Sequence, residues 1–293
     1  MPPLGAHQSI AGGYYKAVEI ARRTGCACVQ VFTKNNNQWR AKPITCEEAQ
    51  KFRATLAELG ITHPLAHDSY LINLGSPDDE LWNKSIDAFV VELERADQLG
   101  IPYVVAHPGS YTTSNEAAGL ARIIAALDQV HERCPTVQAR CLLENTAGQG
   151  SNLGWRFEHL AAILEGVREP HRLGGVCLDT CHLFAAGYAI STARQFKATL
   201  REFDAVVGVH RIKAFHLNDS KTKFGSRVDR HAAIGRGEIG LEAFRTLLND
   251  RRFRSTPMYL ETHKGIEDGQ ELDVINLNVL RGLLRAQRKT TKV

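Results

Sequence analysis

The feature that most constrains the fold of this chain is a repeated alternation of short apolar segments with longer segments of helical pattern. Eight short runs rich in apolar and β-branched residues occur, at residues 4–7, 28–32, 63–67, 103–107, 140–144, 175–179, 212–216 and 258–261. Strands that alternate with helices favour parallel βαβ units, and near-continuous apolar runs indicate strands covered on both faces. Eight such units with no linker between them predict an α/β chain closed into a single (β/α)₈ TIM barrel.

The composition agrees with one large domain. The chain has 293 residues, of which 43% are hydrophobic, and a barrel of about 250 residues is a common solution at this size. We expect one barrel domain over residues 1–280 and a basic C-terminal tail over residues 281–293. The net charge of +4 is compatible with a polyanionic partner but does not require one.

The seven cysteines are scattered and form no C-x-x-C pair, so neither a zinc ribbon nor a thioredoxin-like site is indicated. Reduced thiols in a chain of this length are typical of a cytoplasmic protein. The first residues lack a basic segment followed by an apolar run, and no apolar stretch reaches the ~18 residues that span a membrane. We therefore expect neither a secretory signal nor a membrane partner.

One helix can be predicted in detail from its boundary residues. Ser76 is a suitable N-cap, because its hydroxyl can accept a hydrogen bond from a free backbone N–H. Pro77 suits the first helical position, where its missing N–H has no cost. Apolar residues then recur at helical spacing from Ile86 to Ala96 and predict the buried face. Gly100 is expected to end the helix.

Polar side chains close the third to eighth strands. They are His67, His107, Glu144, Asp179, His216 and Glu261. The carboxyl ends of barrel strands meet at one face, which is where such enzymes hold their active sites. Carboxylates packed together repel one another unless cations neutralise them. Imidazoles combined with carboxylates suit zinc, with manganese and iron as alternatives.

Three further candidate ligands lie in the segments after these strands. His182 follows Asp179 by three residues, and Asp229 and His231 point the same way if their short segment is extended. Two imidazoles and one carboxylate would hold another metal with a coordination position left open. We expect His7 to line the floor of the site. The histidines at helices or connections are expected at the surface, namely His131, His159, His171 and His210.

Taken together, these residues resemble the endonuclease IV family over nearly the whole chain, from Gly5 to about Glu261. The matching motifs include Gly-Ala-His-Gln-Ser-Ile-Ala-Gly-Gly from Gly5, Phe-Thr-Lys-Asn from Phe32, His-Asp-Ser-Tyr from His67, His-Pro-Gly-Ser from His107, Glu-Asn-Thr-Ala-Gly from Glu144, Asp-Thr-Cys-His from Asp179, His-Leu-Asn-Asp from His216 and Val-Asp-Arg-His from Val228. All nine metal-ligand positions of the family carry suitable residues here.

The resemblance implies three zinc ions per chain, with Mn²⁺ as a substitute. One ion would take His67, His107 and Glu144. A second would take Glu144, Asp179, His216 and Glu261, so that Glu144 bridges two ions. The third would take His182, Asp229 and His231. The implied reaction is hydrolysis of the phosphodiester bond 5′ to an abasic site by zinc-activated hydroxide, which leaves a 3′-hydroxyl and a 5′-deoxyribose phosphate. Glu144 and Glu261 are the expected catalytic carboxylates, and Glu261 is a candidate base toward the attacking water.

The implied partner is double-stranded DNA that contains abasic sites, bound by a monomer in the cytoplasm or at the nucleoid. A damaged nucleotide must leave the base stack to reach such a site, and the resemblance points to Tyr70 and residues 35–39 as the groups that fill the gap. The candidate DNA contacts are Lys34, Asn35, Asn37, Gln38, Tyr70 and Arg230. Family members often carry arginine where this chain has Asn37.

Two alternatives remain from the sequence. A metal-dependent sugar isomerase or epimerase on the same barrel would need Glu144, Asp179, His216 and Glu261, but it would not need the third group of ligands. A DNA-damage-binding protein without catalytic activity would not need metals bridged by one carboxylate. Cleavage of abasic DNA, ketose–aldose conversion or binding alone separates the three.

Overall fold

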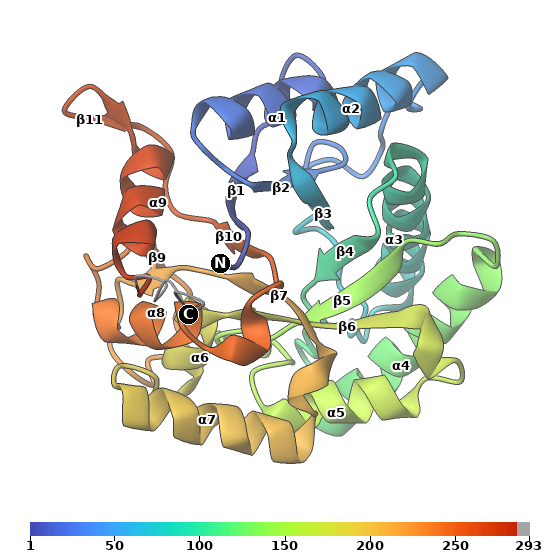
Figure 1. Ribbon diagram of the computed structural model, residues 1–293. Helices are drawn as coiled ribbons and strands as arrows, with labels where there is room; N and C mark the ends of the chain where they lie inside the picture. Colours follow the sequence, from blue (N-terminus) through green and yellow to red (C-terminus); the bar gives the residue numbers. More distant parts are fainter. Residues whose placement is uncertain (286–293) are drawn as a thin grey trace, which may run out of the picture.

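The computed structural model describes residues 1–285, and its eight central strands close into a parallel barrel (Figure 1). Around the barrel the strands follow the order β1-β10-β7-β6-β5-β4-β3-β2. Their bounds are β1 Leu4–Gln8, β2 Cys28–Phe32, β3 Thr62–His67, β4 Tyr103–Ala106, β5 Arg140–Glu144, β6 Leu173–Asp179, β7 Ile212–His216 and β10 Met258–Leu260. The prediction of a single TIM barrel is confirmed, with each strand at its expected place in the sequence.

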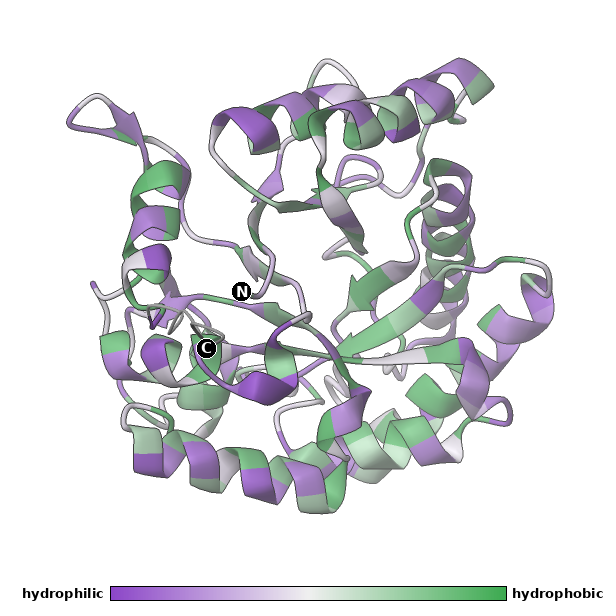
Figure 2. Ribbon diagram, in the orientation of Figure 1, coloured by the Kyte–Doolittle hydropathy of each residue, from purple (hydrophilic) through white to green (hydrophobic). Residues whose placement is uncertain are grey.

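Helices follow the strands along the chain and surround the barrel (Figure 1). They are α1 Tyr14–Arg23, α2 Cys46–Leu59, α3 Asp79–Leu99, α4 Glu116–Arg133, α5 Phe157–Gly166, α6 Thr180–Ala186, α7 Ala193–Val206, α8 Leu241–Leu248 and α9 Leu272–Gly282, with short 3₁₀ turns at Pro170–Arg172, Val209–Arg211 and Arg251–Phe253. Hydrophilic and hydrophobic residues alternate along α3 and α7 in Figure 2, as expected for helices with one buried face. Within residues 1–285, no helix has both the length and the apolar character needed to cross a bilayer.

Two small antiparallel pairs complete the chain. The pair β8 Asp219–Ser220 and β9 His231–Ala232 lies beyond β7 and carries part of the candidate site. The pair β11 Ile266–Glu267 and β12 Gln270–Glu271 precedes α9. Helix α9 continues to Gly282, and Leu283 is buried, so ordered packing extends past residue 280. Most of the expected basic tail, residues 286–293, lies outside the described residues.

The start of α3 differs from the sequence prediction. The helix begins at Asp79, and its N-cap is Asp78, whose Oδ1 accepts a hydrogen bond of 2.7 Å from Leu81 N. Ser76 instead accepts from Asp78 N within the preceding turn. A carboxylate at the N-cap also interacts favourably with the positive end of the helix dipole, which explains why Asp78 takes this position. The predicted end is confirmed, because Gly100 adopts the left-handed conformation with φ 73°.

A layer of apolar side chains fills the barrel interior. Seven strands contribute one residue each, namely Cys28, Leu65, Val105, Leu142, Cys177, Ala214 and Tyr259. On β1 the corresponding residue is Gly5, which pairs in register with Cys28 on one side and Tyr259 on the other. A Cβ at Gly5 would lie 1.9 Å from Cys28 O, so no larger residue fits. The small side chains of Cys28, Cys177 and Ala214, together with Gly5, therefore leave room in this layer for the large ring of Tyr259.

The next layer toward the carboxyl ends of the strands is polar. Side chains of a strand alternate between its two faces, so the residue two positions later faces the interior again. The residues two positions after Gly5 and after the members of the apolar layer are all polar. They are His7, Gln30, His67, His107, Glu144, Asp179, His216 and Glu261; His107 and Glu261 directly follow the last residues of β4 and β10, and the others lie in strands. The barrel thus places one polar side chain from every strand at a single opening.

We expect Gly5→Ala to lower the free energy of unfolding by at least about 2 kcal/mol, because overpacking a closed core forces shifts of backbone and side chains. Urea denaturation at a fixed m-value measures this change. The control is Gly282→Ala at the end of α9, where a Cβ would meet nothing within 4 Å. Equal urea midpoints for the two variants would contradict the proposed packing.

Candidate metal centre

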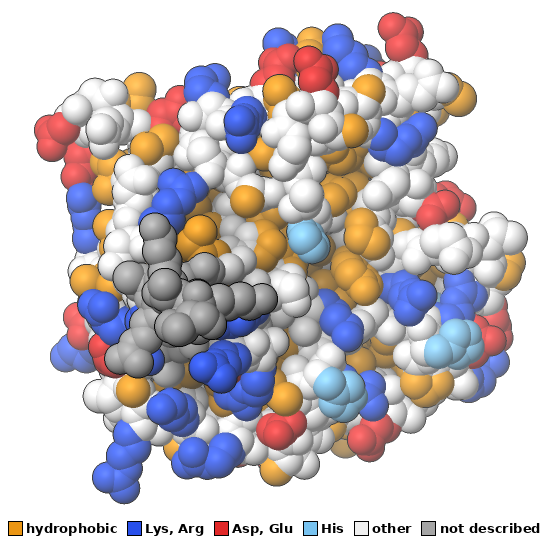
Figure 3. Space-filling model, viewed as in Figure 1, with side chains coloured by type: hydrophobic (Ala, Val, Ile, Leu, Met, Phe, Trp, Pro, Cys, Tyr) orange, Lys and Arg blue, Asp and Glu red, His pale blue; other side chains and the backbone are white. Residues whose placement is uncertain are grey.

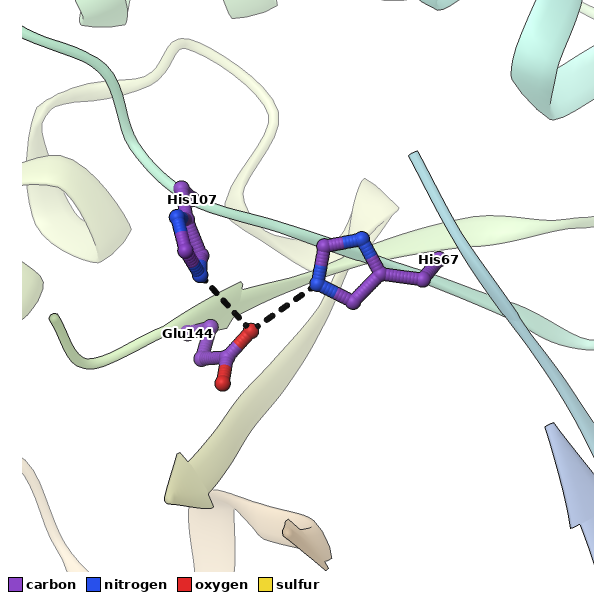
Figure 4. Close-up of side chains that lie close together, drawn as sticks. All are labelled: His67, His107 and Glu144. Atoms are coloured by element: carbon purple, nitrogen blue, oxygen red, sulfur yellow. Dashed lines mark hydrogen bonds and ion pairs between the residues drawn. The ribbon is translucent and has the colours of Figure 1, made fainter. Parts of the chain in front are cut away.

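Glu144 lies at the centre of the polar layer and is fully buried at the end of β5. Figure 4 shows His67 and His107 pointing at the same oxygen of this carboxylate. The Nε2 atoms of His67 and His107 lie 3.1 and 3.2 Å from Glu144 Oε2. Two imidazoles and a carboxylate at these separations can hold one metal ion.

The other oxygen of Glu144 faces a second group of ligands. His216 Nδ1 lies 2.7 Å from Glu144 Oε1 and 3.3 Å from Glu261 Oε2. One ligand atom from each of four residues falls within 4.8 Å of the others, namely Glu144, Asp179, His216 and Glu261. Because the two oxygens of Glu144 face different groups, this side chain can serve both at once.

A third group forms where α6 approaches the segment before β9. Asp179 ends β6 and also caps α6 by accepting from His182 N at 2.8 Å, which brings His182 into the site one turn later. His182 Nε2 and His231 Nε2 each lie 3.1 Å from a different oxygen of Asp229. Cys181 Sγ is also near Asp179 and His231, but burial raises the pKa of this thiol to about 12. The carboxylate and imidazoles are therefore the better donors.

Carbonyl oxygens fix the orientation of four imidazoles in these groups. His67 Nδ1 lies 3.0 Å from Asp68 O, and His182 Nδ1 lies 2.8 Å from Asn145 O. His216 Nε2 lies 2.7 Å from Gln30 Oε1, and His231 Nδ1 lies 3.3 Å from Glu261 O. A carbonyl oxygen can only accept, so in each ring this nitrogen carries the hydrogen. The other nitrogen, which faces the carboxylates, is left available as a metal ligand.

Two of these ligand nitrogens lack a hydrogen bond. Within residues 1–285, His182 Nε2 and His231 Nε2 are buried without a hydrogen-bond partner, although the oxygens of Asp229 lie only 3.1 Å away. The distances permit a bond but the angles do not, as expected when nitrogen and oxygen point at a common third position. A buried polar atom without a partner is unfavourable. Two such nitrogens on either side of one carboxylate are consistent with a site that binds a cation.

The side chains of the site carry strongly shifted pKa values. Burial opposes the charged form of Glu144, but the positive fields of His216 and His107 outweigh burial and hold the pKa of Glu144 well below its usual value. Burial likewise opposes ionisation of Glu261, yet the field of His216 lowers its pKa to about 2. Both carboxylates are therefore ionised at neutral pH and suited to bind cations.

The imidazoles shift in the opposite direction. Burial alone lowers the pKa of His67, but hydrogen bonds to Asp68 and Glu144 outweigh it and raise the pKa well above the usual value. Burial is again the largest effect at His231, and the nearby carboxylates of Asp229 and Asp179 outweigh it, giving a pKa of about 9. In the protein without metal, these rings are imidazolium ions whose positive charge balances the carboxylates. A bound metal ion would take the place of their protons.

Three amide side chains that the sequence analysis missed support the ligands. Gln30 is fully buried and donates to Glu261 Oε1 at 2.6 Å while it accepts from His216. Asn218 donates to Asp179 Oδ2 at 2.5 Å, and Asn145 accepts from Asp179 N at 2.7 Å. A sequence signal existed for Gln30, because a lone amide within the apolar run Cys-Val-Gln-Val-Phe needs a buried partner.

The remaining histidines divide between expected and unexpected positions. His7 lines the floor as predicted, with Nδ1 3.9 Å from Glu261 Oε1, and burial lowers its pKa to about 3. His171 and His210 are exposed as predicted. The prediction was wrong for His131 and His159, which are buried. His131 lies on the inner face of α4, four residues after Leu127, and His159 accepts a hydrogen bond from Gly154 N.

The candidate DNA contacts lie at the rim of the site, with one exception. Those that are exposed are Asn35, Asn37, Gln38, Tyr70 and Arg230. Tyr70 is 66% exposed, and its ring centroid lies 6.1 Å from that of His67, beside a cavity of about 230 Å³. Lys34 is the exception, because it is buried and its Nζ lies 3.2 Å from Glu92 Oε1. The structure thus contradicts the expectation that Lys34 contacts DNA directly.

Surface charge alone does not locate a DNA partner. On the face seen in Figure 3, lysine and arginine side chains gather at the lower left, over α7. Next to the third ligand group, the segment between β8 and β9 carries its own exposed basic residues, namely Lys221, Lys223, Arg227 and Arg230. The Arg227 guanidinium lies 3.9 Å from the centroid of the Trp155 ring.

Comparison with known proteins identifies the family of the chain. Residues 18–279 match the model of the family described as xylose isomerase-like TIM barrel. "Probable endonuclease 4" of Citrifermentans bemidjiense is 48% identical over 284 residues, and that of Chloroflexus aurantiacus is 52% identical over 285 residues; each alignment covers 97% of this chain and 99% of the relative.

Solved structures give the same result. The crystal structure of endonuclease IV from Thermus thermophilus matches with a TM-score of 0.85 and 38% identity, covering 96% of this chain and 98% of that one. D-psicose 3-epimerase matches with a TM-score of 0.67 but only 14% identity, which shows the shared fold alone. On the identity and coverage of its curated relatives and of the solved enzyme, the chain belongs to the endonuclease IV family.

Proposed function

We propose that this protein cleaves duplex DNA by hydrolysing the phosphodiester bond 5′ to an abasic site, leaving a 3′-hydroxyl and a 5′-deoxyribose phosphate. Relatives that match nearly the whole chain carry the name endonuclease 4. The observation that carries the proposal is Glu144, whose two oxygens face two ligand groups while carbonyl oxygens orient the surrounding imidazoles. Cleavage of a duplex with one abasic site, with analysis of both new ends, tests it directly.

We further propose three zinc ions per chain, with Mn²⁺ as a possible substitute. His67, His107 and Glu144 would hold one ion, and His182, Asp229 and His231 another. The remaining ion would be held by Glu144, Asp179, His216 and Glu261. Zinc bound by such donors lowers the pKa of water and neutralises charge that develops on phosphoryl oxygens. The imidazole and carboxylate donors fit zinc better than they fit the harder ions Mg²⁺ or Ca²⁺.

The protein side chains would then have distinct roles. Gln30 holds Glu261 Oε1, so that Oε2 remains directed at His216 and the shared ligand position. A pKa of about 2 makes Glu261 a weak base, which favours its role as a ligand over a role as proton acceptor. Asn218 and Asn145 hold Asp179 in place through both its side chain and its backbone.

The rim would recognise the damaged DNA. Extruding a nucleotide from the stack costs a few kcal/mol, and least at a lesion without a base. Tyr70 is exposed next to His67 and can stack on the neighbouring bases. Asn35, Asn37 and Gln38 would contact the opened duplex, and Arg230 would pair with phosphate. We place this activity in the cytoplasm or at the nucleoid, carried out by a monomer.

A sugar isomerase or epimerase is not favoured. Such an enzyme would use the four ligands around His216, but it would leave His67, His107 and the third ligand group without a role. The epimerase structures are under 20% identical to this chain, whereas the endonuclease relatives reach about half. A binding protein without activity would not need Glu144 between two ligand groups.

Replacing either shared carboxylate should abolish most cleavage. We expect Glu144→Gln and Glu261→Gln each to lower kcat by at least about 100-fold. Each substitution removes a carboxylate that would bind the cations, and these cations stabilise the transition state. Elemental analysis should show reduced zinc in Glu144→Gln. The matched control is Glu165→Gln on the exposed side of α5, which should behave as wild type. Full activity in both site variants would refute the metal model.

Zinc uptake should release several protons per chain at pH 7. The pKa of His231 is about 9 and those of His67 and His182 are raised well above the usual value, so the rings are protonated below these values and must lose protons to bind metal. Zinc affinity should therefore fall as the pH falls. Titration of the demetallated protein with a pH indicator measures the release. His231→Gln should reduce it and His171→Gln should not; zinc uptake without protons would overturn the argument.

Tyr70→Ala should weaken binding to abasic duplex about 10-fold or more, since stacking contributes about 1–3 kcal/mol per base. Binding to intact duplex should change much less. Fluorescence anisotropy in a Glu261→Gln background measures both affinities without cleavage. Tyr70→Phe keeps the ring and should retain binding. An equal loss on both duplexes would remove any lesion-specific role of Tyr70.

A further inference from the structure

Three buried charged side chains lie beside the loop that joins β2 to α2. Glu92 and Arg95 come from α3, and Lys34 comes from the loop itself; their exposed fractions are 1%, 7% and 5%. Removing such groups from water costs several kcal/mol for each ion, unless partners compensate. None of the three belongs to the ligand groups of the metal centre. Their partners therefore indicate a separate role.

Almost all of these partners are in the loop. Glu92 accepts a hydrogen bond of 2.5 Å from Thr33 Oγ1 and pairs with Lys34 Nζ at 3.2 Å. Lys34 Nζ also donates to Gln38 O at 2.8 Å. Arg95 donates to Thr33 O at 2.8 Å and to Lys42 O at 2.7 Å. The three side chains, which we name the α3 anchor, thus bind the loop at its start, middle and end.

The loop has no regular secondary structure between Phe32 and Cys46, and the carbonyl groups of Thr33, Gln38 and Lys42 accept no backbone hydrogen bond of a sheet or helix. The α3 anchor supplies those partners. A further contact to the loop comes from Ser69, which lies two residues after the candidate ligand His67. Ser69 Oγ donates a hydrogen bond of 2.5 Å to Asn36 O. The backbone is therefore held at several carbonyls, while the side chains of Asn35 and Asn37 remain exposed.

Stability alone gives a weak reason to keep these charges. Replacing a buried ion pair by apolar residues of similar size is often neutral or stabilising. An apolar pair could not hold carbonyl groups at defined positions, whereas ammonium and guanidinium groups can. Lys34 and Arg95 donate to backbone carbonyls of the loop and Glu92 accepts from Thr33 Oγ1, which indicates control of loop shape.

We propose that Lys34, Glu92 and Arg95 are positioning residues that fix the loop of residues 33–42 in the shape that engages DNA at the rim of the site. The inference rests on the proposed function and adds to it a determinant of substrate binding outside the metal centre. Lys34 acts here through the loop and does not contact phosphate. Loss of the α3 anchor frees the loop while the metal ligands stay in place.

The test is the double variant Lys34→Met/Glu92→Met, which removes both charges together and so avoids leaving one buried charge unpaired. For cleavage of abasic duplex we expect KM to rise about 10- to 100-fold, the scale of small misplacements of a binding group. We expect kcat at saturating duplex within about twofold of wild type, and unchanged zinc content. Hydrogen exchange of the peptide that spans residues 33–42 should become faster.

The matched control is Arg133→Met. Arg133 lies on α4 and forms an exposed ion pair with Asp87, which is on α3, so its loss should change none of these measurements. Unchanged exchange in the double variant would overturn the proposal, and so would faster exchange with unchanged KM. A fall in kcat together with loss of zinc would also overturn it, because the anchor would then support the metal centre. If the wild-type protein left abasic DNA uncut, the proposed function would fail, whereas the exchange result would still decide whether the anchor fixes the loop.

Discussion

The alternation of side chains along the strands of a closed barrel is the constraint on which the rest of the structure depends. Because the period is two, an apolar layer at one level requires the next inward residues to lie two positions later. In this chain those residues are all polar, and they include Glu144 and His216. The barrel core and the metal centre are therefore adjacent layers of one pattern. A shift of register by one residue would remove both together.

Placing so much charge at one level is possible because the charges compensate one another locally. Carboxylates lie next to imidazoles. The ring nitrogen that faces away from the carboxylates donates to a carbonyl oxygen, such as Asn145 O for His182 and Gln30 Oε1 for His216. This arrangement keeps Glu144 ionised although it is fully buried. Rings oriented in this way need not reorganise when a cation replaces their protons, which favours tight binding.

The strands and six of the nine candidate ligands could be predicted because both depend on short-range periodicity and on strand ends that meet at one face. The other three, His182, Asp229 and His231, follow from their close spacing in the segments after the strands. The errors concern features decided by tertiary contacts. Ser76 and Asp78 are both good caps, and in the structure Ser76 caps the preceding turn while Asp78, whose carboxylate also interacts with the helix dipole, caps the helix. His131 is buried because α4 presents that side to the barrel, as its spacing from Leu127 could have indicated. Lys34 was predicted as a DNA contact, since nothing local in the sequence pairs it with Glu92, which lies far along the chain on α3.

Two buried ionic networks in residues 1–285, one around Glu144 and one around Glu92, differ in the partners of their hydrogen bonds. Around Glu144 the network leaves nitrogen and oxygen atoms pointing at shared positions, so it is incomplete without cations. Around Glu92 every charged group ends on a protein partner, and three of the acceptors, Thr33 O, Gln38 O and Lys42 O, lie in the loop backbone. The first network is therefore suited to bind ions, and the second to hold a flexible segment still. The barrel strands, α6 and the β8–β9 pair together provide the first; the second is what the proposed role of the loop in binding DNA requires.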